Sequence, residues 1–410
     1  MAKGRSPLVI IFVTILIDAI GWAMIVPVLP LYAERFGASE FVVGLLLSSY
    51  GILQFFFAPI LGKLSDRVGR RPVLFVSLIG TAIGFVIMGV APTLAWLFVG
   101  RIIDAITCGN ISTAQAYIAD ITSPEQRSRG MGLVGAAFGL GYIFGPAIAG
   151  IMSLISTAAP FCFAAGLAAA NAIALYFLLP ESLSSEHRTK AGERASIAQV
   201  FEEAGNWPLK AILMTNLFVT VGFTMVTTTY ALFAKHRFDF DVKHTGYMFA
   251  YVGLVGTVIQ VGMIGRLSEL FGDKAVAITG MSIFTASIFM LPVGSSTKML
   301  VIVTTGMAIG YNLILPTIDA LASKSVSEAW QGRVLGVLAS WTSLARIIGP
   351  TVGGWLLSRD AVNGYEHYGR TPFWASGVIM FVALGLAFTV RSGRRRAKEE
   401  LAKEGAVEVT

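Results

Sequence analysis

Twelve long runs of apolar residues constrain this 410-residue chain more than any other feature. A helix needs about 20 mainly apolar residues to cross the hydrocarbon core of a bilayer. Only 13% of the residues are charged, against about 25% in soluble domains, which excludes a soluble fold. The sequence therefore predicts an all-α membrane protein with twelve transmembrane helices. The runs are 7–33, 40–61, 72–91, 94–119, 130–152, 158–180, 208–234, 245–265, 275–292, 298–322, 333–357 and 371–390.

The runs form two sets of six, separated by the polar and charged segment 181–207. We expect an N-terminal six-helix bundle over 1–180, a cytoplasmic linker over 181–207, a C-terminal bundle over 208–391 and a basic tail over 392–410. With both termini inside, Lys and Arg favour the inside segments about threefold, as the positive-inside rule requires. Because the basic residues lie in short segments between spans, the net charge of +7 does not indicate nucleic acid. The basic tail is expected to contact the lipid bilayer at its inner surface.

The two halves repeat each other at an offset of about 204 residues. The charged turn GKLSDRVGRRP (62–72) has a weaker copy, GRLSELFGDK, at 265–274. The Gly-Pro pair at 145–146 recurs at 349–350, each time 16 residues after an arginine. Parallel repeats of this kind build transporters whose halves rock about a substrate site near the bilayer midplane.

The charged turn after the second span is a candidate gate. Gly62 and Gly69 indicate a tight turn, and Asp66 adds nothing to a positive-inside bias. We expect Asp66 to pair with Arg67, Arg70 or a helix N-terminus in one conformation and to lose that contact in another. The alternative is that these charges only set topology.

The fifth and eleventh spans carry a second candidate for conformational gating, formed by Gly141, Gly145, Pro146, Gly349 and Pro350. Small residues allow helices to approach closely, and proline permits a bend. One interpretation is ordinary helix packing. The other is a kinked hinge in the fifth span that seals the bundle against proton leak.

Away from the ends of the apolar runs lie five ionisable side chains: Asp18, Arg101, Asp104, Asp319 and Arg346. Each costs about 2.5–3.5 kcal/mol to place in a bilayer on insertion scales, which makes a functional role the first hypothesis. A carboxyl group in apolar surroundings can exchange its proton near neutral pH. Asp18 and Asp319 are thus the leading proton carriers. The alternative is internal ion pairing of Asp104 with Arg101, three residues away on one helix face, and of Asp319 with Arg346.

Polar and aromatic side chains in the spans are candidates for lining a substrate cavity. A single such residue is more often a helix–helix hydrogen bond or part of the packing, so clustering decides between the two interpretations. Further aromatic candidates are Trp22, Tyr142, Phe223 and Tyr311. The substrate-binding candidates are Gln54, Asn110, Gln115, Asn216, Tyr230, Gln260, Asn312, Trp341 and Arg346.

Motifs of other protein classes are missing from the sequence. There is no GxxxxGK[ST] phosphate loop, no HExxH and no GxSxG. The two cysteines lie inside apolar runs and suggest neither a disulfide framework nor a metal site. The four histidines (187, 236, 244 and 367) are expected in loops, which leaves carboxylates to carry protons. We therefore expect a protein that is not an enzyme, uses no cofactor or metal, and draws on the proton gradient.

Several stretches of the first half resemble one known family. APILGKLSDRVGRRPVLFVSLIG (58–80), DAIGWAMIVPVLP (18–30), GRIIDAITCGN (100–110) and GAAFGLGYIFGPAIAG (135–150) are similar, in the right order, to motifs of the drug:H⁺ antiporter group of the major facilitator superfamily, tetracycline/proton antiporters in particular. The resemblance departs from those antiporters at Phe284, Asp319 and Asp104.

This resemblance implies proton-coupled export of a small amphipathic compound, a tetracycline-like or multidrug efflux activity that confers antibiotic resistance. It also implies a role for Arg101 in proton coupling. The expected partners are the substrate, protons and the bilayer, with no nucleic acid, and we expect a monomer in the inner (plasma) membrane. The alternatives are a facilitator or importer of a small metabolite, or a lipid translocase, on the same fold.

Overall fold

The computed structural model describes residues 7–122, 124–183, 207–326, 328–363 and 367–390, and nearly all of them are helical. Most of the linker over 181–207 and the tail over 392–410 lie outside the described residues. The first half comprises α1 (Pro7–Arg35), α2 (Glu40–Val68), α3 (Arg70–Gly89), α4 (Leu94–Ile106), α5 (Asn110–Ile121), α6 (Pro124–Met152) and α7 (Ala159–Leu178). The second half comprises α9 (Trp207–Phe238), α10 (Val242–Thr257), η1 (Val258–Met263), α11 (Ile264–Phe271), α12 (Asp273–Met290), η2 (Leu291–Val293), α13 (Thr297–Lys324), α14 (Glu328–Val362) and α15 (Arg370–Thr389).

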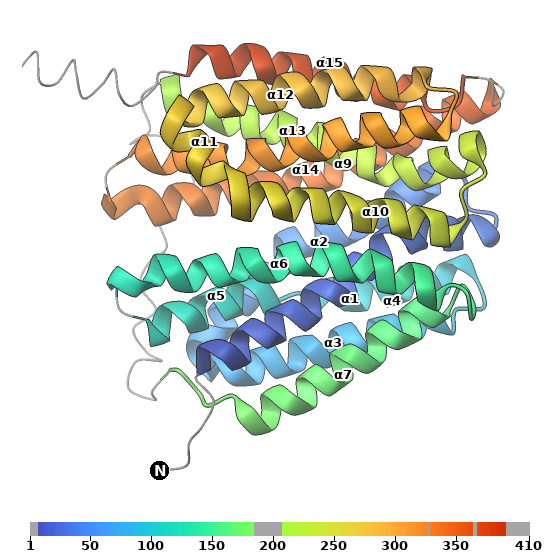
Figure 1. Cartoon of the computed structure of the whole chain (residues 1–410). Coiled ribbons are helices and arrows are strands. Elements are labelled where there is room, and N and C mark those ends of the chain that lie inside the picture. The colour runs from blue at the N-terminus through green and yellow to red at the C-terminus, as the bar shows by residue number, and fades with distance from the viewer. Residues whose placement is uncertain (1–6, 123, 184–206, 327, 364–366, 391–410) are drawn as a thin grey trace, which may run out of the picture. The chain divides into compact units, whose positions relative to one another are not determined.

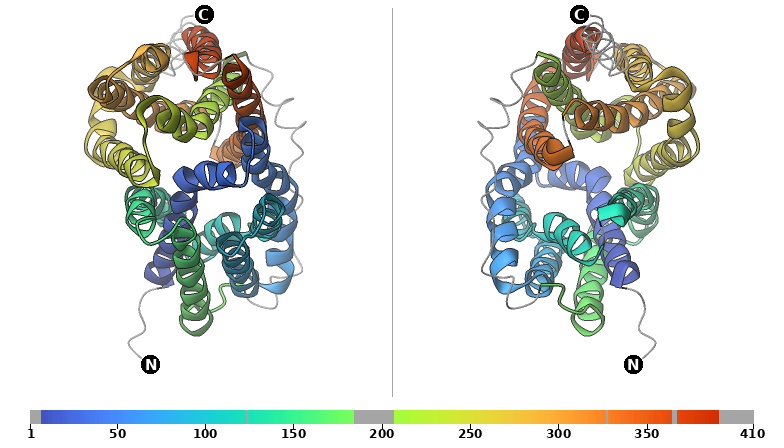
Figure 2. Two further views of the ribbon diagram at one scale, coloured as in Figure 1. Left: turned by 90° about the vertical axis from the view of Figure 1, so that its right-hand side faces the viewer. Right: turned by 90° about the vertical axis from the view of Figure 1, so that its left-hand side faces the viewer.

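These elements correspond to the twelve spans expected from hydropathy. Within the described residues, eleven helical stretches are long and apolar enough to cross a membrane. The remaining expected span, 333–357, lies within the 35-residue helix α14. Figure 1 shows the helices of each half lying side by side, and Figure 2 views them end-on.

The fourth span is broken, although the sequence predicts one continuous run. α4 ends at Ile106 and α5 begins at Asn110, with Thr107 to Gly109 between them. The Thr107 hydroxyl bonds the carbonyl of Ile103, and the Gly109 N–H turns back to the Thr107 carbonyl at 2.7 Å. Broken helices are typical of transporter sites because backbone groups freed at the break can serve a ligand or a side chain.

The eighth span also departs from regular α-helix. Between α10 and α11 it widens into the six-residue π-helix η1, which contains Gln260. π-helical turns inside α-helices are rare and often mark functional sites. Each half thus has one irregular span that carries a predicted polar candidate.

The chain divides into two compact units along a different line from the sequence repeat. Unit 1 is Met1–Glu193 with Met225–Leu254 and Pro350–Pro372, and unit 2 is Arg194–Thr224 with Val255–Gly349 and Phe373–Thr410. Unit 1 therefore includes, besides the first half, residues 225–238 of α9, most of α10 and residues 350–362 of α14. Its core, beneath the first charged turn, is formed by α1, α3, α5, α6 and α7 around the fully buried Tyr117.

Candidate transport site

Asp18 is placed at the break in the fourth span. Asn110, the first residue of α5, donates a hydrogen bond from Nδ2 to Oδ1 of Asp18 at 2.8 Å. The Oδ1 atom of Asn110 is buried and has no partner among the described residues. An ionised Asp18 accepts from the amide nitrogen, whereas a protonated Asp18 can donate to the amide oxygen after the amide turns over. Asn110 therefore suits both protonation states of this carboxyl group.

Arg101 and Asp104 form an ion pair within α4. Nη1 of Arg101 lies 3.3 Å from Oδ2 of Asp104, and both side chains are buried. The guanidinium also lies over the ring of Tyr50 on α2, 4.4 Å from its centroid. Nε of Arg101 is buried with no partner in the part of the chain described. The pair is formed as the spacing indicates, but one donor of Arg101 is left over, and leaving it unsatisfied costs about 1–3 kcal/mol.

Two further candidates of the first half lie at different depths. Gln54 is buried on α2, and Gln115 is exposed on α5. Trp22 and Tyr142, the aromatic candidates of this half, meet edge to face with centroids 5.7 Å apart. The structure thus joins Asp18 to Asn110 and, in a separate contact, Trp22 to Tyr142, while Gln115 lies further along α5.

An aromatic cluster occupies unit 2. The ring of Phe223 on α9 stacks on Tyr311 of α13, with centroids 3.4 Å apart and planes inclined by 6°. Phe284 of α12, fully buried, lies 5.8 Å from the Tyr311 ring. Such stacked faces can pack against the apolar rings of an amphipathic compound.

A polar pair joins the π-helix of the eighth span to α13. Nε2 of Gln260, in the π-helix, donates to Oδ1 of Asn312 at 2.9 Å, and Asn312 in turn bonds the carbonyl of Ala308. Gly256 makes room for this pair, because a Cβ there would lie 2.6 Å from the Asn312 amide nitrogen. The structure therefore brings the two predicted residues Gln260 and Asn312 into direct contact.

Asp319 follows Asn312 by two turns on α13, so the two residues share a face of the helix. Asp319 is exposed, and the described residues include no hydrogen-bond or ionic partner for it. The proposed pair with Arg346 is not formed within this part of the chain.

The remaining predicted residues have structural surroundings. Asn216 is buried, and its amide reaches the carbonyl of Leu338 at 3.5 Å and the hydroxyl of Thr342 at 3.4 Å, which joins α9 to α14. Tyr230 is buried in unit 1 with its ring edge-on to Phe249. Trp341 and Arg346 are half-buried on α14. These contacts favour packing for Asn216 and Tyr230.

The first charged turn forms an ion-pair network. Arg70 pairs with Asp66 on its own turn, bonds Ser65 at 2.7 Å, and reaches Asp120 at the end of α5 at 3.1 Å. Gly69 has φ of 117°, a value that favours glycine over other residues. Arg67 is exposed. The expectation that Gly62 belongs to the turn is wrong, because α2 extends to Val68 and Gly62 is buried within it. Asp66 thus pairs with Arg70, one of the partners expected from the sequence.

Sequence reasoning missed Glu181, which completes this network. Its carboxylate accepts the backbone N–H groups of Arg70 at 2.8 Å and Arg71 at 3.1 Å. These are the first N–H groups of α3, where a negative charge is favourable. Since α3 begins with two arginines, the acid must come from elsewhere, and the end of α7 supplies it. The signal was the acid in the Pro180–Glu181 step directly after the sixth span.

The second charged turn repeats this arrangement with the charges exchanged. Gly272 has φ of 82°, and Asp273 begins α12 and pairs with Lys324 at the end of α13 at 2.6 Å. These positions correspond to Gly69, Arg70 and Asp120 in the repeat. Nζ of Lys274 donates to the Phe388 carbonyl of α15 at 2.8 Å, and Arg71 likewise donates to the Tyr176 carbonyl of α7. Both turns therefore fasten the third helix of a half to its fourth and sixth spans.

The Gly-Pro pairs contact two helices each. Toward its own half, α6 packs on α1, and a Cβ at Gly141 or Gly145 would lie 2.7 Å from the methyl of Ala19 or Ala23. α14 packs on α9 in the same way, where a Cβ at Gly349 would lie 2.9 Å from the Val221 carbonyl oxygen. Only glycine fits these positions without displacing a neighbour.

The opposite faces of α6 and α14 join the two halves within unit 1. A Cβ on Gly246 of α10 would lie 2.7 Å from the carbonyl oxygen of Pro146, and one on Gly44 of α2 would collide with that of Pro350. Gly44 and Gly246 are equivalent positions in the repeat, so the two crossings are related by its symmetry. Ser48 adds a hydrogen bond to Thr351 at 2.7 Å. These contacts close the end of unit 1 that carries the α1–α2 turn, called here the outer end in accordance with the positive-inside orientation.

Two histidines lie elsewhere than the sequence predicts. The expectation that His236 and His244 are in loops is wrong, because α9 extends to Phe238 and α10 begins at Val242. The apolar run ends at 234, but the last helical turn of α9 is polar and hydropathy does not detect it. Within the described residues, no group of three or more His, Cys, Asp or Glu is placed to hold a metal ion.

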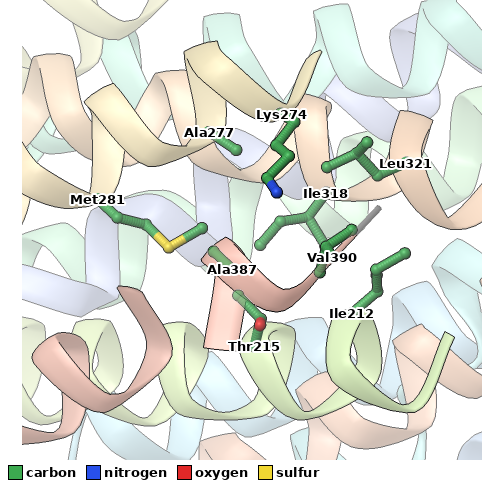
Figure 3. Close-up of a pocket in the computed structure, with 9 residues that line it drawn as sticks. All are labelled: Ile212, Thr215, Lys274, Ala277, Met281, Ile318, Leu321, Ala387 and Val390. Atoms are coloured by element: carbon green, nitrogen blue, oxygen red, sulfur yellow. The ribbon is translucent and has the colours of Figure 1, made fainter. Parts of the chain in front are cut away.

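A small apolar pocket lies in unit 2 away from these candidates (Figure 3). It encloses about 260 Å³ including open space, below the size of pockets that bury drug-sized ligands. The Lys274 amine at its edge is held by the Phe388 carbonyl. It lies between α9, α12, α13 and α15, and none of the predicted substrate-binding residues lines it. The lining residues are Ile212, Thr215, Lys274, Ala277, Met281, Ile318, Leu321, Ala387 and Val390.

Comparison with known proteins agrees with this architecture. The profile of the Major Facilitator Superfamily matches residues 11–264 and 261–409. The chain belongs to the Major Facilitator Superfamily. Members of this superfamily are multi-pass membrane transporters, and the fold of twelve spans in two six-helix bundles is theirs.

Relatives within the superfamily include the class C tetracycline resistance protein of Escherichia coli, 35% identical over 85% of this chain and 89% of that protein. Multidrug resistance protein 2 of Bacillus subtilis is 29% identical over 96% of this chain and 98% of that protein. Among solved structures, a bacterial homologue of the human lysosomal transporter Spinster, inward-facing and occupied, has a TM-score of 0.79 at 16% identity and covers 94% of this chain and 97% of its own.

Proposed function

We propose that this chain is a proton-coupled exporter of a small amphipathic compound that works by alternating access in the inner membrane. The observation that carries the proposal is Asp18, a membrane carboxyl group bonded to Asn110 at the break in the fourth span. The printed names of the relatives, tetracycline and multidrug resistance proteins, support the same activity. No cofactor, metal or enzymatic step is required, and the monomer suffices.

The proton cycle follows from the residues in unit 1. Asp18 takes a proton from the outside when the outer end is open and gives it up to the inside when that end is closed. Asn110 follows the change by exchanging its donor for its acceptor atom. The Arg101–Asp104 pair, held over Tyr50, fixes the charge of α4 beside it. A membrane potential of 100 mV supplies about 2.3 kcal/mol per charge, to which the pH difference adds.

Unit 2 supplies the substrate contacts of the proposal. The stacked Phe223 and Tyr311 rings offer apolar faces, the Gln260–Asn312 pair offers hydrogen bonds, and Asp319 offers an exposed charge. A compound with a ring system, several polar groups and a positive charge matches these three features. Asp319 is a second proton carrier in this proposal, and it releases its proton when the compound binds.

The test is flux of a panel of candidate drugs, tetracycline among them, into sealed proteoliposomes with an imposed pH gradient. The proposal expects uptake of at least one compound that depends on the gradient and is lost in Asp18→Asn and weakened in Asp319→Asn. Gradient-independent exchange that survives both substitutions would instead indicate a facilitator. Movement of a labelled phospholipid between leaflets, without drug flux, would indicate a lipid translocase.

A further inference from the structure

A cluster of ionisable groups lies at the outer end of unit 1, in the last turns of the helices α1 and α9. Glu34, in the last turn of α1, meets Lys235 and His236, in the last turn of α9. Nζ of Lys235 lies 2.9 Å from Oε2 of Glu34, and Nε2 of His236 lies 2.9 Å from Oε1. The Glu34 carboxylate therefore contacts two basic side chains from the other half.

The position of this cluster reflects the repeat. Glu34 and His236 occupy equivalent places in the two halves, as do Gly44 and Gly246 at the two crossings on either side. Equivalent residues meet only where the approximate twofold axis passes between the halves. Glu34 and His236 thus form the central contact of the closed outer end.

The surroundings of the His236 ring are defined by α1, α2 and the segment before α15. Glu34 faces it from α1, and the Tyr368 ring meets it edge-on at 5.0 Å. The Tyr368 hydroxyl donates to Oε1 of Glu40, the first residue of α2, at 3.2 Å. Lys235 is the neighbouring cation, and it leaves the Glu34 carboxylate one oxygen for the ring. The ring is half-buried, with 21% of its side chain exposed, so solvent protons can reach it.

We propose that Glu34, Lys235 and His236 form a proton-binding latch that favours closure of the outer end when the outside is acidic. Histidine ordinarily gains its proton between about pH 8 and pH 5. A neutral ring shares a single hydrogen bond with Glu34, whereas the protonated ring adds a charge–charge attraction. Because α1 and α9 belong to different halves, that attraction exists only while the outer end is closed. External protons therefore stabilise the closed conformation.

This latch fits the direction of the proposed exporter, on which it rests. After the compound leaves, the carrier must close its outer end with protons bound in order to return inward. A low external pH protonates both the transport carboxylates and the latch, and both protonations act in the same direction. Lys235 keeps part of the contact at neutral pH, so the end still closes when the ring is neutral.

The test measures closure directly in lipid vesicles. Nitroxide labels are placed at Ile155→Cys, in the α6–α7 connection, and Val362→Cys, at the end of α14, both strongly exposed and outside the latch. The exposed Cys162 is replaced by Ser. Asp18→Asn and Asp319→Asn remove the proposed transport carboxylates from the pH response. Pulsed electron paramagnetic resonance then gives the ratio of short to long distances between the two labels as the external pH falls from about 7.5 to about 5.5.

We expect the closed fraction to rise about two- to fivefold relative to the open fraction, the range for an ion pair of modest strength. His236→Gln, which keeps a hydrogen bond but not the charge, abolishes the rise. Glu34→Gln abolishes it as well and is the second variant should His236→Gln fold poorly by circular dichroism. The matched control is His244→Gln. The His244 ring pairs with Asp241, three residues earlier in the same half, so this pair does not depend on closure of the outer end.

A flat parent response, a response kept by His236→Gln, or a response lost in His244→Gln would overturn the latch. The measurement needs no transported compound, so its failure leaves the export proposal to the flux assay. Failure of the flux assay with a working latch would instead overturn the export proposal alone.

Discussion

Closure of the outer end depends on glycine at the crossing of α6 and α10. The substitution Gly246→Ala adds one methyl group at a position where two backbone atoms already lie close. The new Cβ would be 2.7 Å from the Pro146 carbonyl oxygen and 3.0 Å from Cα of Gly150. Neither atom can rotate away as a flexible side chain does. The helices must therefore move apart before the outer end can close.

The required movement sets the size of the effect. Ordinary van der Waals contact begins near 3.4 Å, so the crossing must open by about 0.7 Å at Pro146. Overpacking of this kind costs about 1–3 kcal/mol. Only the closed conformation contains the contact, so the equilibrium shifts toward the open outer end by about 5- to 150-fold. The gain in helix propensity from Gly to Ala is the same in both conformations and cancels.

The assay measures the distance between nitroxide labels at positions 155 and 362, in a protein that keeps Asp18 and Asp319. Gly246→Ala is expected to lengthen the main distance, and transport is expected to slow because the carrier no longer returns readily. Gly166→Ala on α7 is the matched control, since a Cβ there meets nothing within 4 Å. If Gly246→Ala gave the same distances as Gly166→Ala, the close crossing would not be part of the gate.

Two further predictions concern the charged turn of unit 2 and the amide at the break. Asp273→Lys is expected to lower transport about two- to fivefold, because it places a like charge beside Lys324. The double variant Asp273→Lys/Lys324→Asp is expected to recover most of the lost transport, as the exchanged charges of the first turn suggest. A double variant without recovery would count against a role for this ion pair. Asn110→Ala removes the hydrogen bond to Asp18, which is worth about 1.5–3 kcal/mol when the carboxyl group is ionised. The substitution is expected to shift the pH dependence of the transport rate. A lower transport rate with an unchanged pH dependence would make Asn110 purely structural.

Hydropathy and spacing predicted much of this architecture because they report local properties. The apolar runs gave the spans, and the three-residue spacing of Arg101 and Asp104 indicated their pair, since residues three apart share a helix face. The repeat also related the two Gly-Pro pairs to each other, and the structure places them in equivalent surroundings. Each of these features depends on neighbours within one helix or on a comparison of two stretches.

The contacts that build the site depend instead on tertiary packing. Asp18 and Asn110 are 92 residues apart, and Glu181 reaches the start of α3 from 111 residues away. Hydropathy treats the fourth span as continuous, because Thr107 to Gly109 are neither charged nor strongly polar. The polar last turn of α9 hid His236 for a related reason, since a helix can extend beyond its apolar run.

The charged turns show how a repeat can conceal its own chemistry. The second turn reads as a weak copy because Asp273 stands where the first has Arg70. The partner at the end of the fourth span changes in step, from Asp120 to Lys324, so the ion pair is kept. A comparison of residues alone scores two mismatches, whereas the structure shows one conserved interaction.

The most direct test of proton-coupled export is proton movement driven by the compound itself. Sealed vesicles with a pH-sensitive dye inside, and no imposed gradient, receive the transported compound from outside. Antiport predicts that the lumen becomes more alkaline as the compound enters, and that Asp18→Asn shows no change. Entry of the compound without any change in internal pH, or an equal change in Asp18→Asn, would contradict the account.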